Sequence, residues 1–332
     1  MTSLKNPAVL NVSRLELHVS YDCANRCIFC SEAGRLKRFS GLNPSPEEIA
    51  GILRVKRAEG FAHVTFTGGE PSLLKYLPQL LRIARALGYK ICVTTNGYAF
   101  ADARYAAGVL PILDEIILSV HGADNCTHDG LTRTPGGFAR TVATLENINK
   151  LSGKSIFLIT NTLALQKNVR ELPGILRWLG SYKAVKQFLI SCPAPEGRAA
   201  AGYDEIVADP CVFSGIVPEL VGIAGRLGKI IRFFGVPACA LGSYAEHSND
   251  FHWAPRLTIE RGSNAGTAVL REVLSLAPTR KRFYSAECIG CRVIGVCGGR
   301  FFAGRRPQLP RGKNRPYGRV YTALSHNEKG CR

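Results

Sequence analysis

The sequence predicts an α/β fold, in which a partial TIM-like barrel of six strand–helix units is followed by a smaller C-terminal domain. Six apolar runs of strand length alternate with helical patterns along the chain, and this alternation stops near residue 200. Alternation of this kind is typical of parallel strands joined by helices, and uninterrupted apolar strands are expected where helices cover a sheet. Six units are fewer than the eight of a closed barrel, so we expect an open one.

Each expected strand is a short apolar run that ends in turn-forming or polar residues. The six runs are 15–20, 63–67, 90–95, 115–120, 155–160 and 186–190. Ser45 is a suitable cap for the first helix, because Pro46 fits the first helical position and Glu48 can complete a capping box. Further helices are expected at about 72–87, 138–151, 168–179 and 212–227, and one more strand at 230–234.

Composition excludes several classes of protein. The 332 residues are 46% hydrophobic and 20% charged, as in ordinary globular proteins and unlike disordered, collagen-like or coiled-coil chains. No apolar run reaches the roughly 18 residues that a membrane helix needs, and the first residues lack the pattern of a signal peptide. We therefore expect a cytoplasmic protein that does not associate with membranes and whose thiols stay reduced.

Twelve cysteines in such a chain indicate metal sites rather than disulfides, and six of them form two tight groups. Cys23, Cys27 and Cys30 have the spacing C-x3-C-x2-C in the loop after the first expected strand. Three thiolates on a [4Fe–4S] cluster leave one iron open for a small molecule, and Phe29 could lie against that molecule. The alternative is a zinc site that borrows a distant fourth ligand.

The first cysteine group has an aromatic residue before its last cysteine, and the motif GGEP follows at the end of the second expected strand. This combination resembles the radical S-adenosylmethionine (SAM) superfamily, over about residues 13–195. The resemblance implies that the three cysteines hold a [4Fe–4S] cluster whose open iron binds SAM. It also implies reductive cleavage of SAM to a 5′-deoxyadenosyl radical, which abstracts a hydrogen atom from the substrate.

The resemblance assigns SAM contacts to residues that follow the expected strands. Gly68, Gly69 and Glu70 would contact the SAM amino group, since glycines allow close approach and a carboxylate accepts from an ammonium. Arg133 resembles an arginine that pairs with the SAM carboxylate, and Ser119 resembles a polar residue that contacts the ribose or methionine part. The implied cofactor contacts are Phe29, Gly68, Gly69, Glu70, Asn96, Ser119, Arg133 and Asn161.

Several of these residues have simpler alternative roles. Asn96 could serve only the turn that follows its strand, Ser119 could bond locally, and Arg133 could be a solvated surface charge. The sequence alone assigns no catalytic residue. His121 and Cys192, which follow the fourth and sixth expected strands, are candidates at the rim of the barrel.

The second cysteine group, Cys288, Cys291 and Cys297, has the spacing C-x2-C-x5-C, and Cys239 lies upstream in the same half. It resembles the twitch or SPASM extensions of radical SAM enzymes, which carry auxiliary iron–sulfur clusters. The cysteine count favours one auxiliary [4Fe–4S] cluster held by all four, and a structural zinc ribbon is the alternative. The expected parts are an N-terminal extension at 1–12, the radical SAM barrel at 13–200, a linker helix and twitch-like auxiliary-cluster domain at 201–300, and a basic tail at 301–332.

The formal net charge of +18 favours acidic partners. An acidic electron donor, a flavodoxin or ferredoxin, fits this charge and the family chemistry, whereas nucleic acid is less favoured because no RNA-binding module is recognised. We expect a radical SAM oxidoreductase or maturase that modifies a peptide or protein side chain. The alternatives are a small natural-product substrate such as a sugar or nucleoside, tRNA modification, and a non-enzymatic iron–sulfur or zinc-stabilised RNA-binding protein.

Overall fold

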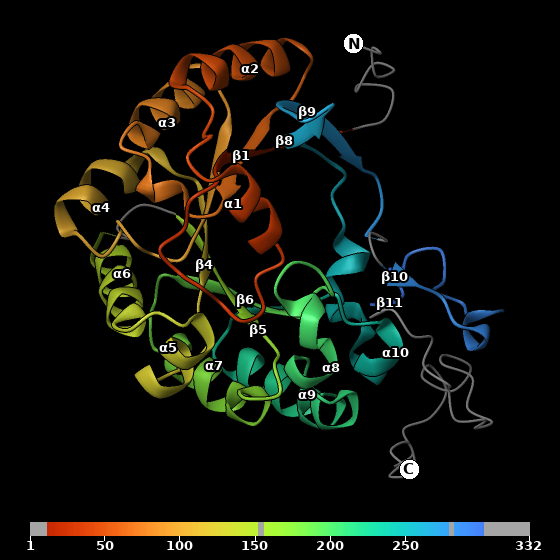
Figure 1. Cartoon of the computed structure of the whole chain (residues 1–332). Coiled ribbons are helices and arrows are strands. Elements are labelled where there is room, and N and C mark those ends of the chain that lie inside the picture. The colour runs from red at the N-terminus through yellow and green to blue at the C-terminus, as the bar shows by residue number, and fades with distance from the viewer. Residues whose placement is uncertain (1–11, 152–155, 279–281, 302–332) are drawn as a thin grey trace.

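The computed structural model describes residues 12–151, 156–278 and 282–301, which are built around a curved nine-stranded sheet (Figure 1). The spatial order is β7-β6-β5-β4-β3-β2-β1-β8-β9. Strands β1 to β8 pair with one another in parallel, and β9 returns antiparallel to β8. The strands are β1 (Arg14–Ser20), β2 (His63–Gly68), β3 (Lys90–Thr95), β4 (Glu115–Ser119), β5 (Phe157–Leu163), β6 (Val185–Ser191), β7 (Ile230–Phe234), β8 (Arg256–Asn264) and β9 (Thr267–Ser275).

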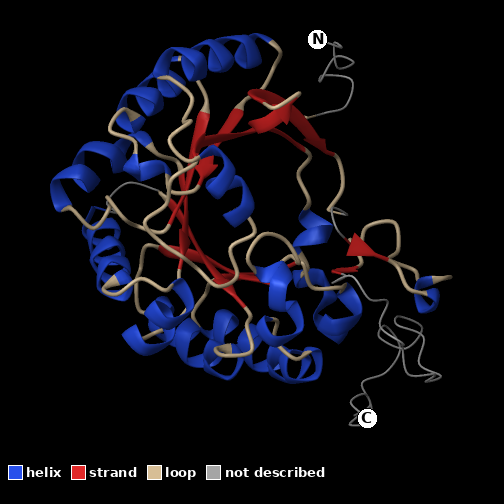
Figure 2. Cartoon of the chain, in the orientation of Figure 1, coloured by secondary structure: helices blue, strands red, loops and turns tan. Residues whose placement is uncertain are grey.

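Helices follow one another around the outer side of this sheet, whereas α1 lies within its curve (Figure 2). A separate two-stranded ribbon, β10 (Arg282–Phe283) with β11 (Arg300–Phe301), flanks the second cysteine group. The α-helices are α1 (Ala33–Phe39), α2 (Pro46–Ala58), α3 (Leu77–Ala86), α4 (Ala103–Val109), α5 (Asn125–Thr132), α6 (Gly137–Leu151), α7 (Leu172–Gly180), α8 (Tyr203–Ile206), α9 (Pro210–Arg226) and α10 (Ala238–Leu241).

Strand β1 shows how the sheet separates an apolar core from a polar interior. Leu15, Leu17 and Val19 are at most 1% exposed and belong to the main hydrophobic core, beneath the outer helices. Glu16 and His18 alternate with them, and successive side chains of a strand point to opposite faces. The core that stabilises the barrel is therefore on its outer side, while the inner face carries polar groups.

The structure confirms the α/β partial barrel, with its first six strands in chain order. The expected cap of α2 is present: Ser45 Oγ accepts from the Glu48 amide at 3.1 Å, and Glu48 Oε2 accepts from the Ser45 amide at 2.9 Å. The strand at 230–234 is β7, which pairs with β6 and extends the sheet. Helices α1, α4 and α5 were not expected, because seven or eight residues are too few to show a helical period.

The β8–β9 hairpin is the largest element that the sequence did not indicate. β8 pairs with β1 in parallel over Arg256 to Ile259, so it adds to the barrel from the edge opposite β7. The side of β8 that faces the barrel interior carries charged residues, including the almost fully buried Glu260. The sequence of β8 therefore lacks the uninterrupted apolar run that predicts a buried strand.

The two ends of the chain lie largely outside the described residues. These are residues 1–11 of the expected N-terminal extension and residues 302–332 of the expected basic tail. Within the described part of the chain, no helix is both long and apolar enough to cross a membrane.

Candidate radical SAM site

The polar residues expected at the site follow the carboxyl ends of the barrel strands. Ser119 on β4 pairs in register with Asn161 on β5, and Asn96 follows β3. Cys23 and its loop follow β1. Because the strands are parallel and adjacent, these groups share one rim of the barrel, which is where such folds carry their chemistry.

The three thiols of the first group converge. The pKa of Cys23 is raised to about 11 and that of Cys27 to about 12, mainly by burial and to a smaller extent by the neighbouring thiols of the group. Burial also raises the pKa of Cys30. The side-chain Nδ2 of Asn96 donates to Cys23 Sγ at 3.6 Å. Neighbouring, half-buried thiols become thiolates when a metal binds them, so this donor set fits an iron–sulfur cluster.

Among the residues that the structure describes, no three His, Cys, Asp or Glu side chains lie close enough together to hold a single metal ion. The thiolates of a cubane cluster bind different iron atoms, so a cluster takes its ligands from farther apart than one ion does.

The cysteine loop rests on the end of α5. The amides of Arg26 and Ile28 donate to the carbonyls of Thr132 and Leu131 at 2.9 and 3.0 Å. The next residue, Arg133, ends the helix in the left-handed conformation with φ of 50° and has an exposed side chain. A non-glycine residue in this conformation is uncommon and points to a local role. The structure thus places Arg133 beside the cysteine loop.

The two glycines at the end of β2, Gly68 and Gly69, allow close backbone packing against the chain that enters the cysteine loop. A Cβ atom at Gly68, whose φ is +133°, would overlap the carbonyl oxygen of Ser20, and one at Gly69 would overlap that of Asp22. The Gly69 amide donates to Ser20 at 2.7 Å, and the Glu70 amide donates to Asp22 at 2.9 Å. These contacts fix the backbone just before Cys23.

Glu70 is fully buried and organises the neighbouring strand end. Its Oε1 accepts from the Ser72 amide at 3.0 Å and from the Thr95 hydroxyl at 2.6 Å, and its Oε2 accepts from the Asn96 amide at 2.7 Å. Burial raises its pKa, while these hydrogen bonds lower it. Glu70 therefore positions Asn96 against Cys23. The sequence did not identify Ser72 or Thr95 as hydrogen-bond partners of Glu70.

Phe29 packs inside the protein rather than facing open space. It is 8% exposed and meets the His121 ring edge-on, with 4.6 Å between ring centroids. His121 Nδ1 accepts from the Leu163 amide at 3.3 Å, and burial holds the pKa of His121 well below its usual range. His121 is thus a neutral side chain held between Phe29 and β5.

The remaining rim residues are held by local contacts. Asn161 Oδ1 accepts from the Ser191 hydroxyl at 2.7 Å. Cys192 Sγ lies 3.7 Å from the Tyr203 hydroxyl, and burial raises the pKa of this thiol to about 11. The Cys192 thiol is therefore held in its neutral form beside Tyr203, and the catalytic roles of Cys192 and His121 stay predictions.

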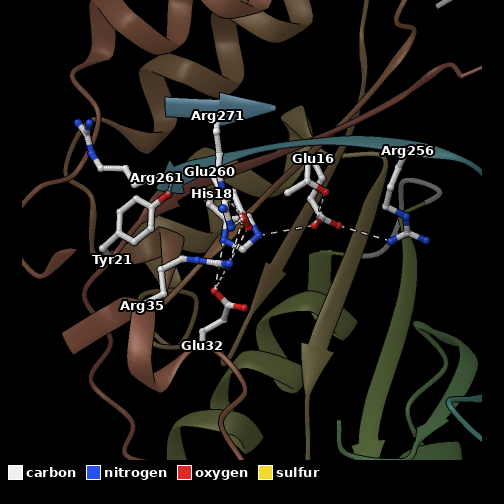
Figure 3. Close-up of polar contacts among 10 residues, drawn as sticks. Glu16, His18, Tyr21, Glu32, Arg35, Arg256, Glu260, Arg261 and Arg271 are labelled. Atoms are coloured by element: carbon white, nitrogen blue, oxygen red, sulfur yellow. Dashed lines mark hydrogen bonds and ion pairs between the residues drawn. The ribbon is translucent and has the colours of Figure 1, made fainter. Parts of the chain in front are cut away.

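A polar network inside the barrel joins the cysteine loop to the β8–β9 hairpin (Figure 3). Arg35, on the helix after Cys30, contacts Glu32 at 2.5 Å and the buried Glu260 at 2.8 Å. Arg271 of β9 reaches the same Glu260 at 2.6 Å. The network explains why the hairpin carries buried charge at the edge next to β1.

His18 extends this network along β1. It lies between Glu16 and Glu32, at 3.6 and 3.7 Å (Figure 3). Burial acts to raise the pKa of Glu16, but the hydrogen bond with His18 and the charge of Arg256 outweigh it and hold that pKa at about 2.

The second cysteine group gathers around α10. Cys239, Cys291 and Cys297 pack on one small apolar cluster with Ala238 and Ala245. Burial raises the pKa of Cys239, and the thiols of Cys297 and Cys288 raise it further, so all four sulfurs share one region.

The group is tied to the barrel by an ion pair that sequence reasoning missed. Arg282 Nη1 lies 2.6 Å from Asp250 Oδ2, and both side chains are almost fully buried. The Gly298 amide, next to Cys297, donates to the same carboxylate oxygen at 2.8 Å.

Comparison with known proteins gives the same family as the motifs. The family model for the Radical SAM superfamily matches residues 17–179. A probable GTP 3′,8-cyclase of Pyrococcus horikoshii is 27% identical over 185 residues, which are 54% of this chain and 56% of that protein. The sporulation killing factor maturation protein SkfB of Bacillus subtilis is 28% identical over 201 residues, 58% of this chain and 45% of SkfB. The chain spans about half the length of these curated relatives.

Among solved structures, Streptococcus suis SuiB bound to S-adenosylmethionine matches with a TM-score of 0.62 at 16% identity, covering 94% of this chain and 77% of SuiB. SuiB has also been solved with its precursor peptide SuiA. At this identity the likeness concerns the fold, and it supports the partial barrel described above. Superfamily members use SAM with a [4Fe–4S] cluster. The match over residues 17–179, together with the cysteine loop and the GGEP motif, places this part of the chain in the radical SAM superfamily.

Proposed function

We propose that the chain cleaves SAM reductively and modifies a peptide or protein side chain. When bound, the cluster and SAM supply one-electron cleavage of SAM to methionine and a 5′-deoxyadenosyl radical, which takes a hydrogen atom from the substrate and becomes 5′-deoxyadenosine. The observation that carries the proposal is the convergence of Cys23, Cys27 and Cys30 at the barrel rim. We propose an acidic flavodoxin or ferredoxin as the source of the electron, because the chain is strongly basic.

The chain's own residues would hold the cofactors. Cys23, Cys27 and Cys30 would bind the cluster. The motif Gly68-Gly69-Glu70 keeps the loop at the strand end, and Arg133 would pair with the SAM carboxylate from beside the loop. The further SAM contacts in the proposal are Phe29, Asn96, Ser119 and Asn161.

A second cluster is part of the proposal. Cys239, Cys288, Cys291 and Cys297 would bind one auxiliary [4Fe–4S] cluster, since the four thiols share one region of the structure. The Gly299 amide donates to Cys297 Sγ at 3.4 Å, and amide hydrogen bonds to sulfur are one means by which proteins tune such clusters.

Iron content tests both sites. We expect about eight iron atoms per chain after anaerobic reconstitution, at four per cubane. The triple variant Cys23→Ala/Cys27→Ala/Cys30→Ala should keep about half of the iron and lose 5′-deoxyadenosine formation. The matched control, Cys288→Ala/Cys291→Ala/Cys297→Ala, should also lose about half but keep the cleavage of SAM. Stoichiometric zinc, or 5′-deoxyadenosine formed by the first variant, would refute the proposal.

A peptide substrate is supported by two matches: SkfB is named a maturation protein, and SuiB has been solved with a precursor peptide. The match to a GTP 3′,8-cyclase favours a nucleotide as the second candidate. Deuterium transfer separates them. Label moving from a deuterated peptide into 5′-deoxyadenosine supports the first class, and label moving only from deuterated nucleotides supports the second.

A further inference from the structure

The chain that leaves β6 folds back over the cysteine loop. The Arg198 amide donates to the carbonyl of Cys30 at 2.8 Å. The Arg198 guanidinium donates through Nη1 to the carbonyl of Cys27. One residue thus contacts the backbone at two of the three cysteines of the first group, from an element about 170 residues away in the sequence.

The preceding glycine explains how Arg198 comes so close. Gly197 has a φ of +57°, and a Cβ atom there would overlap the carbonyl oxygens of both Cys30 and Ser31. Ala199, which follows Arg198, is fully buried and anchors the segment on the other side of Arg198. We call Gly197, Arg198 and Ala199 the clasp. Its backbone lies directly on the loop, and a larger side chain at Gly197 would push it away.

The clasp also brings positive charge to one side of the site. The hydrogen bond from its Nη1 holds the Arg198 guanidinium at the backbone of Cys27, and the Arg198 amide is held at the backbone of Cys30. Cys23 is differently placed: the Glu70 charge acts on it, and the Asn96 side chain bonds to its sulfur. The cation therefore faces the Cys27 and Cys30 side of the proposed cluster.

We propose that Arg198 is a positioning residue that holds the cysteine loop by its backbone carbonyls and raises the reduction potential of the bound cluster. The inference rests on the proposed cluster at Cys23, Cys27 and Cys30. Reduction adds one negative charge to a cluster, so a nearby cation favours the reduced form. An arginine suits both tasks, because its planar guanidinium donates several hydrogen bonds while it stays charged.

The test measures the reduction potential of the first cluster alone. The second group is removed by Cys288→Ala/Cys291→Ala/Cys297→Ala, and the remaining cluster is titrated by electron paramagnetic resonance. Arg198→Gln should lower the ratio of reduced to oxidised cluster about tenfold at a fixed potential, which corresponds to about 59 mV for one electron. Arg198→Lys, which keeps the charge, should stay near the parent potential.

Arg26→Gln is the matched control, because it removes the same charge from an exposed side chain of the same loop. Water and salt screen that charge, so the potential should not move. Hydrogen exchange of the amides of residues 26–31 gives a second readout in the apoprotein. We expect these amides to exchange faster in both Arg198 variants than in the parent protein. In Arg26→Gln they should exchange at the parent rate.

Each outcome decides the proposal. A parent-like potential in an Arg198→Gln protein with full iron content would refute the electrostatic part, and parent-like exchange would refute the positioning part. If Arg198→Gln takes up no iron, uptake by Arg198→Lys supports the proposal, and failure of both refutes the charge effect. A parent protein that binds no iron would instead refute the proposed function, which keeps the two failures distinct.

Discussion

The ion pair between Asp250 and Arg282 allows a sharp test of how the second cysteine group is held. The two side chains are 0% and 1% exposed, and their atoms are 2.6 Å apart. The Arg282 guanidinium also lies over the rings of Phe234 and Phe301, at 5.3 and 5.0 Å from their centroids. Asp250→Asn would leave this cation buried without its counter-charge.

Breaking a buried pair from one side costs about 3–5 kcal/mol, because the remaining charge stays desolvated. Asp250→Asn should therefore lower the free energy of unfolding by about that amount. It also weakens the acceptor for the Gly298 amide beside Cys297, so iron at the second group should fall. The measurements are chemical denaturation and iron content, the latter in a protein whose first group has been replaced by alanines.

The control is an ion pair of the same length at the surface. Arg177 and Glu219 are also 2.6 Å apart, but their side chains are 56% and 47% exposed. Glu219→Gln should cost only roughly 0–1 kcal/mol, since water and salt screen exposed pairs. If Asp250→Asn and Glu219→Gln cost the same, and the iron at the second group stays complete, burial does not set the strength of this contact and our reasoning is wrong.

Three further predictions concern the rim and the barrel interior. Glu70→Ala leaves the buried donors of Ser72, Thr95 and Asn96 without their acceptor, so stability should fall by at least about 3 kcal/mol in denaturant titrations; an unchanged midpoint would contradict this. Arg133→Gly should stabilise the fold by about 1 kcal/mol, because glycine accepts the left-handed conformation, yet weaken SAM binding roughly 10- to 150-fold in calorimetry; equal affinity would remove its assigned role. The pKa of Glu16 is lowered to about 2, so its ionisation adds at most about 3 kcal/mol to the free energy of unfolding above about pH 4.5, and this stabilisation is lost as the pH falls towards 2. In Glu16→Gln, the free energy of unfolding should depend less on pH over this range.

Sequence patterns predicted the parts of this molecule that local chemistry determines. The first seven strands lie where apolar runs end in turn residues, and β7 has the expected bounds, Ile230–Phe234. The capping box at Ser45 needs only residues three apart, and it is present. The motif GGEP was placed at the end of β2 because the run 63–67 precedes it.

Contacts between distant segments could not be predicted in the same way. Arg198 reaches Cys27 across 171 positions, and Glu260 pairs with Arg35 across 225. No periodicity or spacing connects such residues. In β8, Thr258 and Glu260 are buried because they complete a polar interior, so the strand lacks an apolar run. The sequence showed which residues bear the chemistry, but the supports around them depend on the tertiary fold.

The supports of the first cysteine loop come from four separate elements, and most of them act on backbone atoms. The end of α5 accepts from the Arg26 and Ile28 amides, the glycines at the end of β2 hold the chain before Cys23, and the clasp after β6 holds the carbonyls of Cys27 and Cys30. Only Asn96 contacts a cysteine sulfur among these supports in the described chain. Backbone contacts do not depend on the side chains of the loop itself. Positions such as the exposed Ala24 should therefore accept substitution, whereas a Cβ at Gly69 or Gly197 should displace the loop and its thiols together.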